Sequence, residues 1–326
     1  MRHSIFTSVS LALSLGAITV MATPGPLSVV ATFNPAAAEL PESVTLDDDG
    51  TFYMSMERSV RRLSPGNNLE VLANIPIPAG AFVNGVKIGP NGDVYAVSGG
   101  FSSSPPAAFV WRIEENGTVH QVAATDPSGF LDDLAFDDDD NLYATDSLLG
   151  VIWKISPCGA VTPWLTSPLL LGDPAHPAVV ISPFGAVGIA FDAKQRNAYV
   201  ANLDRGAIVR IPIDKHGAAG VPEVFVQSPL LVGADGIAFD KEGTLWVGVQ
   251  VQDRVATVAP NGAISVILQG GLLDAPASLV FGTRGKDQKT LYIANFAINR
   301  ALGTQPGTPR PALLAFPVGV KGQPLP

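Results

Sequence analysis

Four side chains that could bind a cation stand at one recurring position of the sequence. Each lies eleven residues before an aromatic residue, and the four are Glu42, Asn84, Asp132 and Asp235. Carboxylate and amide oxygens are the ligands that calcium takes from proteins, and a carboxylate can also act as a general base. Three carboxylates held close together repel one another unless a cation compensates them. A fold that gathers these residues would therefore create a calcium site; the alternative is that they only cap strand ends, as Asp and Asn often do.

The aromatic residues mark a hairpin that is repeated six times. Each copy is a short apolar run, a turn rich in Asp, Asn and Gly, and a second apolar run, which is typical of a β-hairpin. The copies span 42–55, 84–97, 132–145, 187–201, 235–248 and 277–294. Successive aromatic residues are 42, 48, 56, 47 and 46 positions apart, which is the period of a propeller blade rather than of a helical solenoid.

Each repeat also carries a second hairpin further along the chain, so that a repeat supplies four strands. Three clear examples are residues 109–123, 151–165 and 254–268. We therefore predict an all-β fold, a six-bladed β-propeller of four-stranded blades. Its last repeat has one obvious strand after Tyr292, at 311–316, while the strand-like run 27–33 precedes the first repeat. Because an open blade would expose unpaired strand edges, we expect the N-terminal strand to complete the sixth blade and close the ring.

In a propeller, the residues that open the innermost strands converge on one face of the central channel. Three carboxylates and one amide of this sequence would meet there, from blades one, two, three and five. The equivalent residues of blades four and six are Val187 and Ala277, which offer no side-chain ligand. The predicted metal site therefore consists of Glu42, Asp132 and Asp235, with Asn84 assisting.

Three of the repeat copies resemble a known family. PESVTLDDDGTFYMS, FLDDLAFDDDDNLYATDS and ADGIAFDKEGTLWVG are similar to repeats of the senescence marker protein and gluconolactonase-like family of six-bladed, calcium-dependent propellers. The resemblance implies that Glu42 and Asp235 are metal ligands and that Asp132 stands where the family has Asn. It also implies that Val187 replaces a second Asn ligand, which makes calcium a tentative cofactor. In that family the equivalent of Asp235 is the catalytic carboxylate, which acts as general base or nucleophile in the hydrolysis of a lactone.

Apolar residues near the opening positions form the expected rim of the channel. They are Phe82, Phe130, Phe184, Val187 and Phe296. A funnel with polar groups at its base and apolar groups at its mouth suits a fairly hydrophobic small molecule. A long segment, 166–188, adds His176 to the expected substrate rim, either as an acid or base or as an ordinary surface histidine.

Two functions are consistent with these residues. The first is a secreted, calcium-dependent hydrolase of the gluconolactonase type, a lactonase or esterase. The second is a metal-free propeller that binds or cyclises a hydrophobic small molecule without hydrolysis, which the valine at position 187 favours. No other cofactor-binding motif is present in the sequence.

The N-terminus predicts export from the cytoplasm. Residues 1–22 combine a short basic start, an apolar run and a small-residue cleavage site, as signal peptides do. We expect residues 23–326 to form a single propeller domain, secreted or periplasmic, monomeric, and free of the membrane after cleavage. The net charge of −9 argues against nucleic acid as a partner, because phosphate binding requires concentrated basic charge. Cys158 is the single cysteine, so no intrachain disulfide forms.

Overall fold

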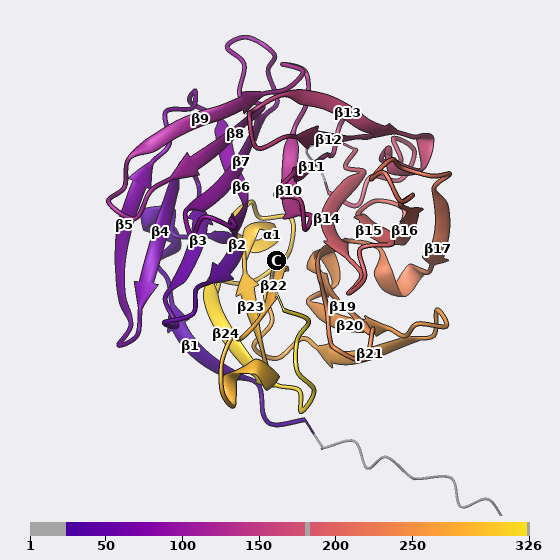
Figure 1. Cartoon of the computed structure of the whole chain (residues 1–326). Coiled ribbons are helices and arrows are strands. Elements are labelled where there is room, and N and C mark those ends of the chain that lie inside the picture. The colour runs from indigo at the N-terminus through magenta and orange to yellow at the C-terminus, as the bar shows by residue number, and fades with distance from the viewer. Residues whose placement is uncertain (1–23, 180–182, 325–326) are drawn as a thin grey trace, which may run out of the picture.

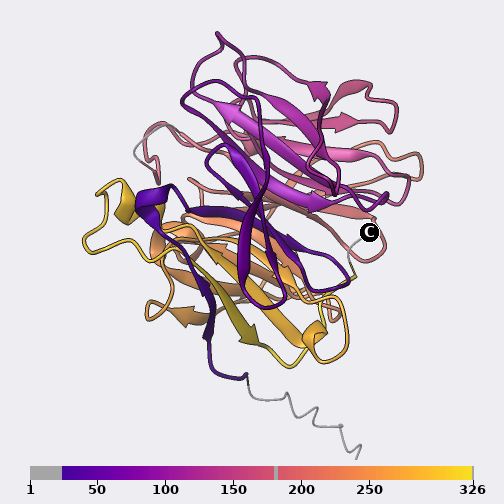
Figure 2. The same ribbon diagram turned by 90° about the vertical axis from the view of Figure 1, so that its left-hand side faces the viewer.

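A computed structural model describes residues 24–179 and 183–324 of the chain. These residues form six four-stranded antiparallel sheets arranged in a ring around a central axis (Figure 1). Seen from its edge, the ring has strands that run between its two faces (Figure 2). The predicted six-bladed β-propeller is confirmed.

Five blades are built from consecutive strands. Blade one contains β2 (Pro41–Leu46), β3 (Phe52–Met56), β4 (Ser59–Ser64) and β5 (Asn68–Asn74). Blade two contains β6 (Ala81–Ile88), β7 (Val94–Gly100), β8 (Phe109–Ile113) and β9 (Val119–Ala124). Blade three contains β10 (Leu131–Phe136), β11 (Leu142–Asp146), β12 (Val151–Ile155) and β13 (Val161–Thr166).

Blade four contains β14 (Ala186–Phe191), β15 (Asn197–Asn202), β16 (Ala207–Pro212) and β17 (Glu223–Gln227). Blade five contains β18 (Ala234–Phe239), β19 (Leu245–Val249), β20 (Arg254–Val258) and β21 (Ile264–Gln269). Short helices occupy some of the loops: η1 (Pro35–Ala37), η2 (Pro168–Leu170), η3 (Pro229–Leu231), η4 (Gln250–Gln252), η5 (Asp287–Lys289) and α1 (Ile298–Ala301).

The sixth blade joins the two ends of the sequence. Its strands are β22 (Pro276–Phe281), β23 (Thr290–Asn295), β24 (Ala312–Pro317) and, at the outer edge, β1 (Ser28–Thr32). Strand β1 pairs antiparallel with β24, with Ser28 opposite Ala315 and Thr32 opposite Ala312. The expected closure of the ring by the N-terminal strand is thus confirmed, and it removes one unpaired edge from the last blade.

The recurring aromatic residue of each repeat packs between neighbouring blades. Tyr143 of blade three meets Phe191 of blade four edge-on, with ring centroids 5.1 Å apart. The same contact recurs as Tyr95 with Phe136, Tyr199 with Phe239, and Trp246 with Phe281. Edge-to-face aromatic pairs add about 1 kcal/mol beyond the area they bury. The repeated aromatic therefore holds adjacent blades together, which explains its regular spacing.

In several repeats, an aspartate at the start of the hairpin turn accepts a hydrogen bond from the polar group of the same aromatic residue. The Tyr143 hydroxyl donates to Asp137 over 2.9 Å, and the Trp246 indole N–H donates to Asp240 over 2.9 Å. Asp137 also accepts the backbone N–H groups of Asp139 and Asn141. The acidic turns of the repeats are therefore structural elements of the hairpins.

The innermost strands β2, β6, β10, β14, β18 and β22 contact one another around the channel. Small residues permit this approach. A Cβ atom added at Gly236 would lie 2.4 Å from the carbonyl oxygen of Ala277, and one at Gly85 would lie 2.7 Å from the Cα of Asp133. Neighbouring innermost strands therefore approach closely just after the opening residues Asn84 and Asp235.

The predicted signal peptide, residues 1–22, lies outside the described residues. Within the part of the chain that the structure describes, no helix has the length and apolar character needed to cross a membrane.

Candidate functional site

Three carboxylates meet where the innermost strands begin. Glu42, Asp132 and Asp235 are the second residues of β2, β10 and β18. One carboxylate oxygen of each lies within 4.8 Å of the corresponding oxygens of the other two. Asp132 and Asp235 are 7% and 5% exposed. The topology of the propeller therefore gathers three acidic side chains from blades one, three and five at one end of the channel.

Each carboxylate accepts a hydrogen bond from a side chain that lies in the second strand of its own blade or directly after that strand. The Ser55 hydroxyl donates to Oε2 of Glu42 over 3.3 Å. The Ser147 hydroxyl donates to Oδ2 of Asp132 over 3.0 Å.

Gln250 plays the same part in blade five. Its side-chain amide donates to Oδ2 of Asp235 over 2.9 Å. Among the described residues, no hydrogen bond engages Oε1 of Glu42 or Oδ1 of Asp132 and Asp235. Each carboxylate thus has one oxygen fixed by its blade and one left for a ligand.

The three carboxyl groups are weaker acids than usual, because the fold buries them close to one another. Burial raises the pKa of Asp132 to about 7, and burial followed by repulsion from Asp132 raises the pKa of Glu42 and of Asp235 well above their usual range. Hydrogen bonds from Ser147 and Gln250 lower the pKa values of Asp132 and Asp235 but do not offset burial. Bringing these groups together as anions is costly unless a positive charge is supplied.

The donor set fits a calcium ion. Calcium binds oxygens at 2.3–2.6 Å, so two oxygens on one ion are separated by at most about 5 Å, and the three carboxylates meet this limit. Asn84 is buried, and its side-chain N–H donates to the carbonyl of Leu131 over 2.6 Å, which leaves its side-chain oxygen as the available donor. Since calcium takes six to eight oxygens, water or substrate would complete the shell.

At the corresponding position, blade four has the apolar residue Val187. It is the second residue of β14, as the three carboxylates are of their strands, and it is 1% exposed. Its side chain belongs to one apolar cluster with Phe130 and Phe184. The site is therefore acidic on the side of blades one, three and five and apolar toward blade four.

The residues predicted for the substrate rim lie in different surroundings. Phe130 and Phe184 are buried, and Phe82 packs against their cluster. Phe296 is half-buried, and its backbone N–H donates to the carbonyl of Ala275. His176 does not contact Glu42, Asp132 or Asp235 in the described residues. Its side chain is 85% exposed, and its Nδ1 lies 3.3 Å from the carboxylate of Asp173.

Asp204 holds the long segment that follows η2. Its carboxylate accepts the backbone N–H of Asp173 over 3.0 Å and that of Ala178 over 2.7 Å. It is 4% exposed, and burial raises its pKa. The segment that contains His176 is thus fastened to the end of β15.

Two neighbouring aspartates have structural partners. Asp133 accepts one hydrogen bond from the ammonium group of Lys87 over 3.1 Å and another from the backbone N–H of Ile189. Asp146 is fully buried and accepts the backbone N–H groups of Phe130, Leu148 and Leu149. These contacts position strands and loops around the site.

Four residues of the site are absent from the sequence-based set: Ser55, Ser147, Gln250 and Phe101. Ser147 and Gln250 each follow their carboxylate by fifteen residues, so the repeat spacing contains a signal for them. Phe101 stacks on two predicted rim residues, with ring centroids 5.0 Å from Phe130 and 6.0 Å from Phe184. It lies in the loop between the second and third strands of blade two, residues 101–108, and the repeat does not fix the length of this loop, so periodicity offers no signal for it.

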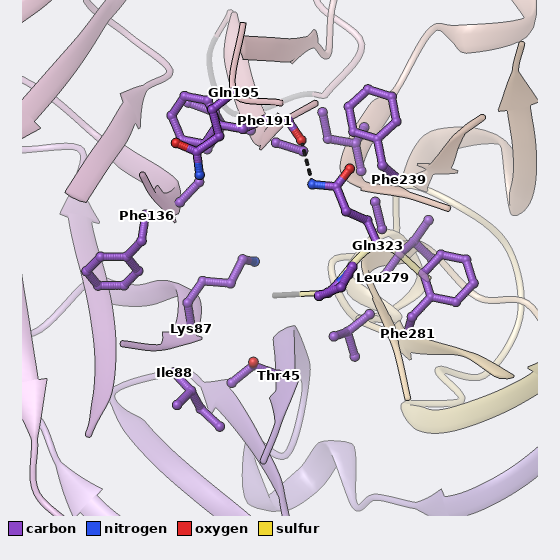
Figure 3. Close-up of a pocket in the computed structure, with 17 residues that line it drawn as sticks. Thr45, Lys87, Ile88, Phe136, Phe191, Gln195, Phe239, Leu279, Phe281 and Gln323 are labelled. Carbon is purple, nitrogen blue, oxygen red and sulfur yellow. Dashed lines mark hydrogen bonds between the residues drawn. The ribbon is translucent and has the colours of Figure 1, made fainter. Parts of the chain in front are cut away.

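A cavity of about 110 Å³ lies at the opposite end of the channel from the carboxylates. The side chains of Lys87 and Thr45 point into this cavity (Figure 3). Gln323 of the C-terminal segment also lines it, and its side-chain amide donates a hydrogen bond to the carbonyl of Phe191 over 3.1 Å. The backbone N–H of Gln323 also donates to the carbonyl of Phe239. The C-terminal segment therefore covers the end of the channel that is farther from the carboxylates.

Comparisons with known proteins agree with this architecture. Residues 183–296, which span β14 to β23, match the family model described as the SMP-30/gluconolactonase/LRE-like region. No curated protein matches the chain by sequence.

Solved structures share the fold at low sequence identity. A putative gluconolactonase has a TM-score of 0.66 at 16% identity, covering 92% of this chain and 94% of its own. A calcium-binding protein, regucalcin from Agrobacterium tumefaciens, has a TM-score of 0.64 at 17% identity, covering 88% and 92%.

Another similar structure is that of a protein named as a lyase. A catalytically inactive virginiamycin B lyase from Staphylococcus aureus, solved with quinupristin, has a TM-score of 0.59 at 16% identity, covering 84% of this chain and 79% of its own. The fold alone therefore does not select a reaction. The family resemblance of the repeat motifs is confirmed: the chain is a six-bladed propeller that carries an SMP-30/gluconolactonase/LRE-like region at residues 183–296.

Proposed function

We propose that the protein is a calcium-dependent hydrolase of the gluconolactonase type that acts on a fairly apolar lactone or ester. The observation that carries the proposal is the convergence of Glu42, Asp132 and Asp235, each with one oxygen bound by its own blade and one unengaged. The family match over residues 183–296 supports the same class of chemistry. We further propose that the protein is exported as a monomer that acts on small molecules.

In this proposal Glu42, Asp132 and Asp235 hold the ion, with Asn84 contributing its side-chain oxygen. When bound, calcium polarises the substrate carbonyl and offsets the negative charge that develops on its oxygen. Gln250 fixes one oxygen of Asp235, so that the carboxylate keeps a constant direction toward the substrate.

Asp235 is the proposed general base. It removes a proton from water while the water oxygen bonds to the carbonyl carbon. The carbon–oxygen bond of the lactone or ester then breaks, and the departing oxygen receives the proton that Asp235 took up. The products are a carboxylic acid, which loses the second proton of the water to solvent and becomes the carboxylate, and the free hydroxyl group, and Asp235 returns to its ionised form.

The test is hydrolysis of a panel of lactones and esters with calcium and with a chelator. We expect turnover with calcium, its loss on chelation, and a reduction of at least about a hundredfold in Asp235→Asn. Asp139→Asn is the matched control, because Asp139 lies exposed in a hairpin turn. Turnover that survives both the chelator and Asp235→Asn would reject the proposal.

A second candidate function is favoured by Val187. Its buried apolar side chain occupies the opening position of blade four and joins the cluster of Phe130 and Phe184. A propeller of this kind could bind or cyclise a hydrophobic small molecule without metal. The two candidates differ in their response to calcium, since the second expects ligand binding that is unchanged by a chelator.

A further inference from the structure

We infer that Phe101, Phe130 and Phe184 form an aryl-binding subsite beside the carboxylates, and that the preferred ligands carry an aromatic ring on the oxygen or nitrogen atom that is bonded to the carbonyl carbon. The inference deepens the proposed function and rests on it for the orientation of the carbonyl.

The three rings form one compact cluster. Phe130 and Phe184 meet edge-on with centroids 5.3 Å apart and an interplanar angle of 86°. Phe101 lies over both, at 5.0 Å from Phe130 with an angle of 34° and at 6.0 Å from Phe184 with an angle of 81°. Both inner rings are buried, whereas Phe101 is 44% exposed. Phe101 therefore remains accessible to a ligand, while the two rings beneath it are enclosed by the fold.

The inner rings cannot easily move away from Phe101. A Cβ atom at Gly99 would lie 2.7 Å from the ring of Phe130, so the glycine makes room for that ring. The backbone of Phe130 is held at both ends, because its N–H donates to Asp146 and its carbonyl accepts from Ser147. The subsite is therefore preorganised, which lowers the cost of binding.

Ser147 connects the aromatic cluster to the acidic site. Its hydroxyl donates to Asp132 over 3.0 Å, and its backbone N–H donates to the carbonyl of Phe130 over 2.9 Å. Its own carbonyl accepts the N–H of Gly185, the residue after Phe184, over 2.9 Å. One residue thus fixes a carboxylate relative to two of the three rings, and a ligand that reaches Asp132 lies beside the aromatic cluster.

The apolar character continues to the floor of the site. Val187 belongs to the same cluster as Phe130 and Phe184, and Phe82 and Leu148 pack against it. A charged or heavily hydroxylated ligand would leave its polar groups without partners on this side. An aryl group would instead pack on the exposed side chain of Phe101, above the buried rings of Phe130 and Phe184, while its carbonyl faces the carboxylates. The expected ligands are therefore aryl-fused lactones and aryl esters.

Lactams provide a test of binding that does not depend on hydrolysis. 3,4-Dihydroquinolin-2-one and δ-valerolactam share a six-membered ring with a carbonyl and differ in the fused benzene ring. We expect calorimetry to show that the calcium-loaded protein binds the aryl lactam at least about tenfold more tightly than valerolactam. In Phe101→Ala the aryl lactam should bind about fivefold more weakly, with valerolactam changed less than about twofold.

Matched variants distinguish the loss of an aryl-binding side chain from the loss of any exposed apolar side chain and from unfolding. Leu302→Ala is the control, because Leu302 is 52% exposed in the loop between the second and third strands of blade six, as Phe101 is in blade two. Phe101→Trp should retain the preference for the aryl lactam. Thermal unfolding of each variant verifies that the fold is intact.

Hydrolysis of dihydrocoumarin and δ-valerolactone, the corresponding lactones, tests the proposed function separately. A preference for the aryl lactam that depends on Phe101, with neither lactone hydrolysed, would support the subsite and count against the hydrolase. Equal affinities for the two lactams, or an unchanged preference in folded Phe101→Ala, would overturn the subsite whatever the hydrolysis shows.

Discussion

The side-chain amide of Gln250 donates a hydrogen bond to the carboxylate of Asp235 over 2.9 Å. Gln250 directly follows β19, and Asp235 lies at the start of β18, so the contact joins two neighbouring strands of blade five. It leaves Asp235 with one fixed oxygen and one unengaged oxygen, as in the two other acidic blades.

Replacing Gln250 by Leu should lower kcat for lactone hydrolysis about tenfold while KM changes little. A lost hydrogen bond to a charged group corresponds to about 1.5 kcal/mol, and Asp235 would no longer be held in one direction. Steady-state kinetics give both constants. Gln227→Leu is the control, since Gln227 makes one exposed side-chain hydrogen bond to the carbonyl of Arg205. An unchanged kcat in Gln250→Leu would show that this contact does not position the base.

Without calcium, the free energy of unfolding should fall as the pH rises from about 5 to 8. The folded protein raises the pKa of Asp132 to about 7, whereas the unfolded value is about 3.9. A raised pKa in the folded state contributes stability below the unfolded pKa, and this contribution is lost as the pH rises through the folded pKa.

Urea unfolding at a series of pH values, in chelator, measures this effect. Asp132→Asn should show a smaller fall because the titrating group is gone, and added calcium should reduce the fall in the unchanged protein. The same pH dependence in the unchanged protein and in Asp132→Asn would show that Asp132 does not have a raised pKa in the folded protein.

Thr45→Val should stabilise the fold by about 1 kcal/mol. The Thr45 hydroxyl is fully buried and has no hydrogen-bond partner among the described residues. Valine has nearly the same shape and removes the unsatisfied polar group. Thermal unfolding compared with Thr257→Val, at another buried threonine, gives the difference. A loss of stability in Thr45→Val would indicate that the hydroxyl has a partner, such as water, in the cavity at that end of the channel.

A chain that begins at residue 39 should unfold at a temperature roughly 10 °C lower than one that begins at residue 23. The shorter chain lacks β1, which pairs with β24, and also loses the bond from Asn67 to the carbonyl of Val30. The exposed edge of β24 should promote self-association, which light scattering detects. Equal melting temperatures would mean that β1 does not contribute to closing the ring.

The sequence predicted the propeller because its repeats are local. An aromatic residue, an acidic turn and two apolar runs recur at every hairpin, and Tyr143 shows why: its ring packs on Phe191 while its hydroxyl binds Asp137. Strand order and ring closure followed from the same periodicity. The convergence of Glu42, Asp132 and Asp235 was likewise predictable, since they occupy one position of the repeat.

The remainder of the site depends on contacts that the repeat does not encode. Phe101 lies in a loop whose length differs from blade to blade, and its packing on Phe130 and Phe184 depends on the path of three separate segments. The C-terminal segment reaches the channel through hydrogen bonds of Gln323 to blades four and five. Such contacts between segments distant in sequence leave no periodic pattern.

Thermal unfolding of the chain from residue 23, in chelator and then with calcium added back, tests the central claim most directly. The account predicts a rise of about 2.7 kcal/mol in stability at a hundredfold excess of calcium over its dissociation constant. This corresponds to roughly 5 °C, and Glu42→Gln should abolish most of it. A melting temperature that stays constant up to millimolar calcium would contradict the assignment of Glu42, Asp132 and Asp235 as a calcium site.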